Sequence, residues 1–259
     1  HARFTVPNSA DGYCTDDNAR ALLFTMYLED MGLDTPETRR VGSRYAALLS
    51  AAFDFKRRRF RNFLGFDRHW LEEDALGSDD CFGRAVRALG ACIGRSKQRA
   101  LQSWAMEPFQ IALLSSGDLT SPRAWAGTLI GIHEYLRRLS GDRLVNEVRE
   151  TLTRRLIDRY RDTATDDWPW FEDSLSYDNA RLSHALILSG YWTSNPEATE
   201  IGLRTLGWLC ELQRTPQGHF RPIGSNGFYR RGEQRADFDQ QPIEAWAMVS
   251  ACAEAYRTS

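Results

Sequence analysis

Acidic residues precede apolar helical segments at four places in the chain. The residues Asp-Asn-Ala-Arg occur twice, at 17–20 and 178–181, and related acidic starts occur at 78–85 and 237–245. A carboxylate at a helix start can act as a base or accept hydrogen bonds from sugar hydroxyls. It can also simply cap the helix, which contributes about 0.5–2 kcal/mol. Four similar starts in one chain favour a shared polar site over four unrelated caps.

The predicted bases are the aspartates at these helix starts, because backbone amides and the helix dipole stabilise an ionised carboxylate there. They are Asp17, Asp80, Asp178 and Asp239. Their polar and aromatic neighbours are predicted to bind the sugar: Tyr13, Asp16, Asn18, Arg20, Asp79, Tyr177, Asn179, Arg181, Gln240, Gln241 and Glu244. In the two repeated motifs, the arginine at i+3 can also form an ion pair with the aspartate on the same helix face.

An aromatic and acidic segment precedes the second Asp-Asn-Ala-Arg. Residues 166–173 contain three aromatic rings and four acids. Glu172 follows Trp170 and Phe171, whose apolar rings would favour the protonated form that a general acid requires. We therefore predict that Glu172 is the proton donor, and that Trp168, Trp170 and Asp173 contribute to sugar binding. A surface or capping carboxylate is the alternative for Glu172.

Two other function classes stay open. His133 and His184 lie in predicted helices, where a histidine could serve a sugar epimerase as acid or base or could be an ordinary core residue. A glycan-binding module without catalysis would need neither histidine. The chain has no zincin, phosphate-loop, dinucleotide or nucleophile-elbow motif and no EF-hand spacing. We therefore predict no metal and no cofactor.

Helical periodicity covers most of the chain and predicts the elements that position these residues. Apolar residues recur every three or four positions near 17–30, 36–54, 80–93, 97–115, 121–139, 143–160, 178–190, 196–213 and 239–256. Long aromatic connections at 55–78, 161–177 and 214–238 alternate with short ones. This alternation predicts helical hairpins, with a short β-hairpin in the loop at 214–238. We expect an all-α fold, an (α/α) toroid in one domain over residues 1–259.

Composition and charge restrict the classes of partner that the chain is expected to bind. A net charge of −2 and a pI near 6.3 argue against a nucleic-acid partner or an anionic membrane. No segment reads as a membrane span, and five cysteines without C-x-x-C spacing favour reduced thiols and a cytoplasmic location. The expected partner is a saccharide substrate.

Three segments carry a resemblance to a known group of proteins. Residues 12–22, 168–181 and 238–245 resemble a bacterial helical domain that is encoded with, or fused to, glycosyltransferases. That group is similar to the six-hairpin glycosidases and the N-acylglucosamine 2-epimerase relatives. The resemblance implies an (α/α) toroid, a carbohydrate context and a glycosyltransferase as partner or fused domain. Nine helices fall short of the twelve in a complete ring, so the ring is incomplete or a hairpin precedes His1, in a longer polypeptide of which this is the C-terminal part.

Overall fold

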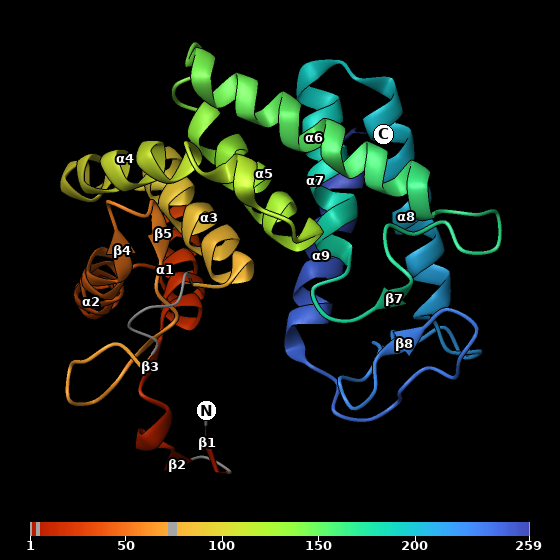
Figure 1. The fold of residues 1–259 in the computed structure, drawn as a ribbon, viewed down its shortest axis with the longest axis horizontal. Coiled ribbons are helices and arrows are strands. Elements are labelled where there is room, and N and C mark those ends of the chain that lie inside the picture. Colours follow the sequence, from red (N-terminus) through yellow and green to blue (C-terminus); the bar gives the residue numbers. More distant parts are fainter. Residues whose placement is uncertain (1, 4–5, 72–76, 259) are drawn as a thin grey trace. The chain divides into compact units, whose positions relative to one another are not determined.

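The computed structural model describes residues 2–3, 6–71 and 77–258, and α-helices dominate these residues (Figure 1). The expected all-α class is confirmed. Nine helices occur in the described residues, each within a few residues of its predicted position. They are α1 (Thr15–Asp30), α2 (Pro36–Ala52), α3 (Asp79–Arg95), α4 (Arg99–Leu113), α5 (Pro122–Leu136), α6 (Arg143–Thr163), α7 (Ala180–Thr193), α8 (Pro196–Leu212) and α9 (Pro242–Thr258).

Short strands connect some of the helices as four antiparallel pairs. They are β1 (Ala2–Arg3) with β2 (Val6–Pro7), β3 (Tyr13–Cys14) with β6 (Phe63–Leu64), β4 (Phe53–Asp54) with β5 (Arg59–Phe60), and β7 (Ser174–Leu175) with β8 (Tyr229–Arg230). Two 3₁₀ helices, η1 (Ser9–Asp11) and η2 (Ser116–Asp118), complete the elements.

The loop at 214–238 differs from its predicted β-hairpin. A turn at residues 225–227 is present, but the strand that follows it, β8, pairs with β7 in another loop. Within the loop, the only pairing among the described residues is the single antiparallel bridge between Arg214 and Phe220. The pairing of β7 with β8 holds the loop at 214–238 beside the segment that leads into α7.

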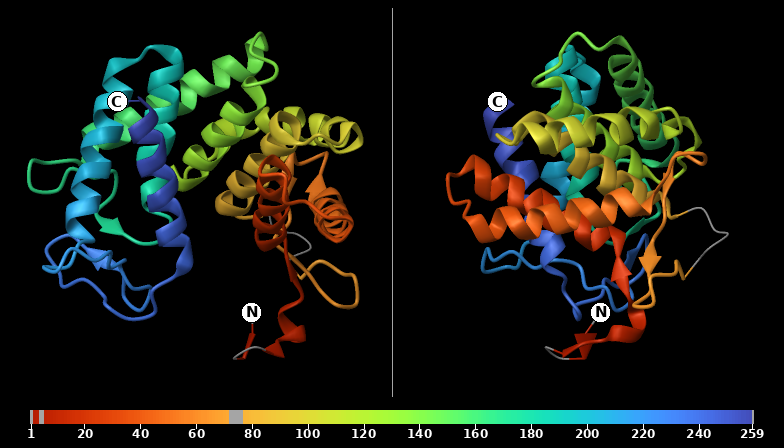
Figure 2. Two further views of the ribbon diagram at one scale, coloured as in Figure 1. Left: turned by 180° about the vertical axis from the view of Figure 1, so that it is seen from behind. Right: turned by 90° about the vertical axis from the view of Figure 1, so that its left-hand side faces the viewer.

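The chain forms two compact units, residues 1–148 and 149–259. In the first unit α1 packs on α3 and α3 packs on α5, while α2 packs on α1 and α4 on α3 (Figure 2). In the second unit α7 packs on both α8 and α9. Within each unit, the odd-numbered helices that carry or follow the acidic starts therefore pack on one another.

Local sequence signals explain why several helices begin where they do. Thr35 caps α2 with a capping box, and Pro36 fills the first helical position. At the start of α8 the Asn195 side chain accepts from the Ala198 amide, and Pro196 fills the first helical position. Ser78 and Ser121 cap α3 and α5 through the same kind of bond. These caps fix the starts of α2, α3, α5 and α8.

Glycines allow α3 and α5 to approach closely. A Cβ added at Gly90 would lie 2.1 Å from the carbonyl oxygen of Gly131, and one added at Gly131 would lie 2.7 Å from that of Val86. Real Cβ atoms do not approach backbone this closely, so a side chain at either position forces the two helices apart. The relative position of the starts of α3 and α5 therefore depends on these glycines.

We expect Gly90→Ala to lower the free energy of unfolding by about 2 kcal/mol, because the added methyl overpacks the contact between α3 and α5. Urea denaturation followed by circular dichroism measures this change. Gly207→Ala is the matched control, since Gly207 also lies in a helix but has no atom within 4 Å of an added Cβ. The control should be neutral or stabilising by up to about 1 kcal/mol. Equal stability of the two variants would contradict the close packing.

Candidate functional site

The second Asp-Asn-Ala-Arg brings the start of α7 against the start of α9. The carboxylate of Glu244 accepts a hydrogen bond from the backbone N–H of Asp178 and another, of 2.9 Å, from Nδ2 of Asn179. Asn179 is fully buried, and Glu244 and Asp178 are 3% and 8% exposed. Two acidic residues from distant parts of the sequence thus meet in one buried polar cluster.

Arg181 completes this cluster from the next turn of α7. Its Nε donates to Oδ1 of Asp178 at 3.2 Å, and its guanidinium lies 4.3 Å from the centre of the Trp246 ring. The ion pair at i+3 within the repeated motif is therefore confirmed. Asp178 itself has φ of 51°, in the left-handed region, which Asp adopts more readily than most residues with a side chain.

In this cluster, the surroundings of Glu244 shift the pKa of its carboxyl group. Its pKa rises to about 7, mainly because burial disfavours the charged form. The hydrogen bond from Asn179 opposes the rise, and the negative charge of Asp178 adds to it. A carboxyl group with this pKa holds a proton through much of the neutral range, as a general acid must.

Glu244 was expected only as a sugar ligand, and its perturbed environment could not be foreseen from the sequence. Asp239 was expected as the base at the last helix start. The structure instead begins α9 at Pro242, where proline suits the first helical turn, and leaves Asp239 exposed in the preceding loop. The acid buried in the first turn of α9 is therefore Glu244, five residues after Asp239.

The loop before α9 carries several exposed polar residues. The Asp239 carboxylate accepts hydrogen bonds from the Ser225 hydroxyl and, at 3.1 Å, from Nε2 of Gln241. Gln240 donates through Nε2 to the carbonyl of Asp237 at 3.1 Å. Asp239 and Gln241 therefore contact each other at an exposed surface, and their expected role in sugar binding stays a prediction.

Tyr177 lies in the segment that leads into α7, directly before Asp178. Its ring centre is 6.4 Å from that of Phe228, which belongs to the loop at 214–238. Tyr177 is half-buried, so part of the ring remains available to a ligand. The aromatic loop therefore reaches the segment that leads into the buried cluster.

The aromatic segment before α7 forms core rather than a sugar-stacking surface. Trp168 and Trp170 were expected to contact sugar, but they are 3% and 0% exposed, and a buried ring has no face free for stacking. Nε1 of Trp168 donates to the backbone carbonyl of Glu172 at 2.8 Å. Glu172 is half-buried and Asp173 is exposed. Their expected roles as acid and sugar ligand stay predictions.

The first Asp-Asn-Ala-Arg lies in the other unit, at the start of α1. Arg20 pairs with Asp17 at i+3 and, at 3.4 Å, with Asp16, and Asp16 also pairs with Arg84 of α3. Asn18 donates through Nδ2 to the carbonyl of Cys14 at 2.7 Å. These ion pairs hold the start of α1 to α3.

Tyr13 directly precedes this motif and offers an aromatic surface. Its ring stacks on Phe66 with a centre-to-centre distance of 4.9 Å, and the two side chains are 38% and 57% exposed. Tyr13 is therefore accessible in the way that its predicted sugar-binding role requires.

Asp79 and Asp80 join the starts of α3 and α5. One Asp79 oxygen accepts from the amides of Thr120 and Ser121 at 2.7 and 3.0 Å, and the other accepts from Arg59 at 2.7 Å. Asp80 accepts from the Ser121 hydroxyl at 3.2 Å. Burial alone would raise the pKa of Asp79, but these hydrogen bonds and the charge of Arg59 hold it below its ordinary value. Asp79 therefore has a structural role as an ionised bridge between two helices.

Asp79→Ala should lower the free energy of unfolding at pH 7 by about 2 kcal/mol, because Arg59 and two amides lose their acceptor. The difference should shrink as the pH falls below 3.8 and through the lower folded pKa, where Asp79 of the unchanged chain also becomes protonated. Urea denaturation at several pH values measures it. Glu37→Ala, at an exposed ion pair, is the control and should change stability by less than about 0.5 kcal/mol.

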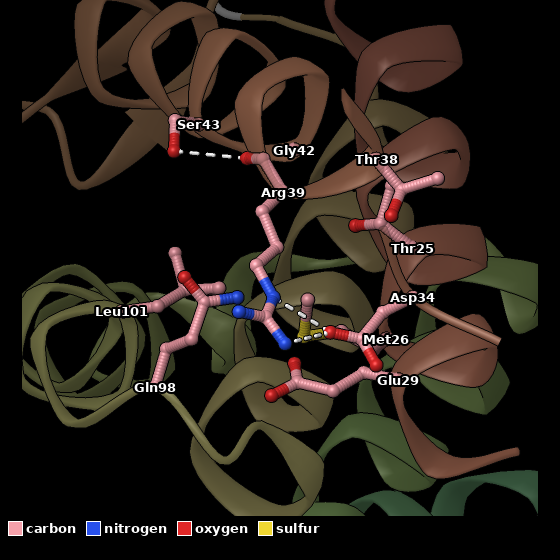
Figure 3. Close-up of a pocket in the computed structure, with 10 residues that line it drawn as sticks. All are labelled: Thr25, Met26, Glu29, Asp34, Thr38, Arg39, Gly42, Ser43, Gln98 and Leu101. Carbon is pink, nitrogen blue, oxygen red and sulfur yellow. Dashed lines mark hydrogen bonds and ion pairs between the residues drawn. The ribbon is translucent and has the colours of Figure 1, made fainter. Parts of the chain in front are cut away.

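No predicted site residue lines either of two hollows in the described surface. A pocket between α1, α2 and the start of α4 is crossed by Arg39, which pairs with Asp34 (Figure 3). Its volume of about 10 Å³ suits one water molecule, not a sugar. An open groove of about 470 Å³ is lined by α6 and the start of α8, including Arg154, Asp158 and Glu197. The acidic clusters are therefore identified by their contacts and not by a cavity.

Comparison of the chain with protein-family models and with curated protein sequences gave no match. Among the described residues, no helix combines the length and the apolar character needed to cross a bilayer.

Proposed function

We propose that the chain is a carbohydrate-active enzyme, a glycoside hydrolase or a related lyase that acts on an oligo- or polysaccharide. The observation that carries this proposal is the buried contact of Asp178 and Asn179 with Glu244. Hydrolysis of a glycosidic bond needs one protonated and one ionised carboxyl group. Burial favours a proton on Glu244, and the Asp178 carboxylate is ion-paired with Arg181.

In this proposal Glu244 donates its proton to the oxygen of the leaving sugar. Asp178 acts as the base that activates water or as the charge that stabilises the oxocarbenium-like transition state. Tyr177, Asp239 and Gln241 would bind hydroxyl groups from the exposed side. Glu172, expected from the sequence as the acid, remains the competing donor. The test must therefore separate the two glutamates.

The order of hairpins within each unit supports a second, structural part of the proposal. Successive odd-numbered helices pack on one another in both units, as they do in an (α/α) toroid. We propose that the chain is an incomplete toroid of the six-hairpin glycosidase kind, located in the cytoplasm and partnered by or fused to a glycosyltransferase. The five free cysteines suit a reducing compartment. An experimental structure of the whole chain would test the toroid.

Incubation of the purified chain with a panel of oligosaccharides, reading both binding and released sugar, tests the function. We expect release from at least one glycan, and its loss in Asp178→Asn and Glu244→Gln. Binding that persists in these variants separates lost chemistry from lost recognition. Sugar release at an unchanged rate in both variants would refute the assignment, and binding without release by the unchanged chain would make it a glycan-binding module.

A sugar epimerase is the second candidate, because His184 lies on α7 one turn after Arg181 and is 7% exposed. A histidine there could remove and return a proton on a sugar carbon. Incubation of the sugar panel in D₂O distinguishes the two functions. Deuterium at a sugar carbon, abolished by His184→Asn, would indicate epimerisation, whereas release of a reducing end without carbon-bound deuterium indicates hydrolysis.

A further inference from the structure

Three sulfur atoms meet between α8 and α9 in the second unit. Sγ of Cys210 lies 3.8 Å from Sγ of Cys252 and 3.6 Å from Sδ of Met248. Cys210 belongs to α8, whereas Met248 and Cys252 lie one turn apart on the same face of α9. Both cysteines are half-buried and Met248 is 7% exposed, so solvent reaches the cluster from the thiol side.

The spacing of these atoms suits a single metal ion. Two sulfur atoms that each lie roughly 2.3 Å from one ion are about 3.8–4.0 Å apart at tetrahedral or trigonal angles. The separations of Cys210 Sγ from Cys252 Sγ and from Met248 Sδ, 3.8 and 3.6 Å, are close to the spacing that two ligands of one ion require. Thiolate and thioether ligands together select soft monovalent ions such as Cu(I), whereas Mg²⁺ and Ca²⁺ prefer oxygen and Zn²⁺ prefers thiolate and imidazole.

We propose that Cys210, Cys252 and Met248 form a three-sulfur site for a soft monovalent metal ion, with Cu(I) as its probe. On binding, two S–H bonds break and two Cu–S bonds form, while the Met248 thioether donates a lone pair. Two protons leave to the buffer, and copper stays Cu(I), so no oxidant or reductant is required. The bound ion would join α8 to α9. This proposal is independent of the carbohydrate activity.

Competition for Cu(I) under anaerobic conditions tests the site. The reduced full chain is titrated against the Cu(I)–bicinchoninate complex, and loss of the colour of that complex reports transfer. We expect one Cu(I) per chain, with affinity at least about 100-fold lower in Cys210→Ser and Cys252→Ser and about 10-fold lower in Met248→Leu. Cys14→Ser, at a half-buried thiol of the other unit, is the matched control and should bind like the unchanged chain.

X-ray absorption of the Cu(I)-loaded chain tests the ligand set directly. We expect three sulfur neighbours in the unchanged chain and two in Met248→Leu, a variant of similar volume that preserves apolar packing. Circular dichroism checks that each variant is folded. Failure of the unchanged chain to take Cu(I) from bicinchoninate, or unchanged affinity in folded Cys210→Ser, would overturn the proposal.

Discussion

Replacement of Glu244 by Gln is expected to lower kcat for sugar release by roughly 10²–10⁴-fold, the usual contribution of a general acid. Gln has nearly the same shape and can still accept a hydrogen bond from the Asp178 amide, but it has no proton to transfer. KM should change little, because the substitution removes chemistry and not the surrounding ligands. Initial rates on the glycan identified by the panel measure both constants.

Two further variants make this experiment decisive. Glu211→Gln, at an exposed side chain of α8, controls for the loss of one negative charge and should keep full activity. Glu172→Gln tests the acid expected from the sequence. A rate within tenfold of the unchanged chain in Glu244→Gln, together with a collapse of the rate in Glu172→Gln, would transfer the role of proton donor to Glu172.

The pH dependence of kcat/KM gives an independent check on the donor. In the proposed mechanism Glu244 acts in its protonated form, so activity of the unchanged chain should fall as the pH rises through about 7. Asp178→Asn removes a neighbouring negative charge and should lower the pKa of Glu244. Any residual activity of that variant should therefore decline at a lower pH.

Glu244 should also make the stability of the chain depend on pH, with the second largest effect. Its folded pKa, about 7, lies above the ordinary value of 4.5, so the folded state holds this proton more tightly than the unfolded state. The resulting stabilisation is complete below pH 4.5 and is lost as the pH rises to about 7. We expect a loss of about 3 kcal/mol across this window relative to Glu244→Gln, which does not titrate.

Urea denaturation of both chains at pH values from 4 to 8 measures this difference. Comparison with Glu244→Gln cancels the titration of the other groups that the two chains share. Carbon-13 NMR of labelled glutamate carboxyl groups, assigned with the same variant, gives the folded pKa directly. A constant stability difference between the two chains from pH 4 to 8 would show that Glu244 titrates like an ordinary glutamate.

The helices were predictable because their signals are local. Apolar periodicity together with Thr35-Pro36 and Asn195-Pro196 specifies α2 and α8 within a few residues of sequence. The pairing of Arg20 with Asp17 and of Arg181 with Asp178 follows equally from helical spacing. No contact between distant segments is needed for either prediction.

The environment of each acidic residue was not predictable in the same way. The pKa of Glu244 is raised mainly by burial, and its polar contacts come from residues more than sixty positions earlier, so its environment depends on how α7 and α9 pack. Trp168 and Trp170 have the composition of a sugar-binding surface but are taken up by the core. Aromatic and acidic residues occur both in sugar-binding surfaces and in buried cores, and only the three-dimensional contacts distinguish the two.

The buried carboxyl group at the start of α9 places activity and stability in opposition during evolution of this chain. In the proposed mechanism the reluctance of Glu244 to ionise suits it to donate a proton, and the same reluctance weakens the fold at neutral pH. Mutants selected for heat resistance alone should therefore include neutral replacements at position 244, and these should be inactive. When selection requires activity as well as heat resistance, glutamate should be retained at position 244.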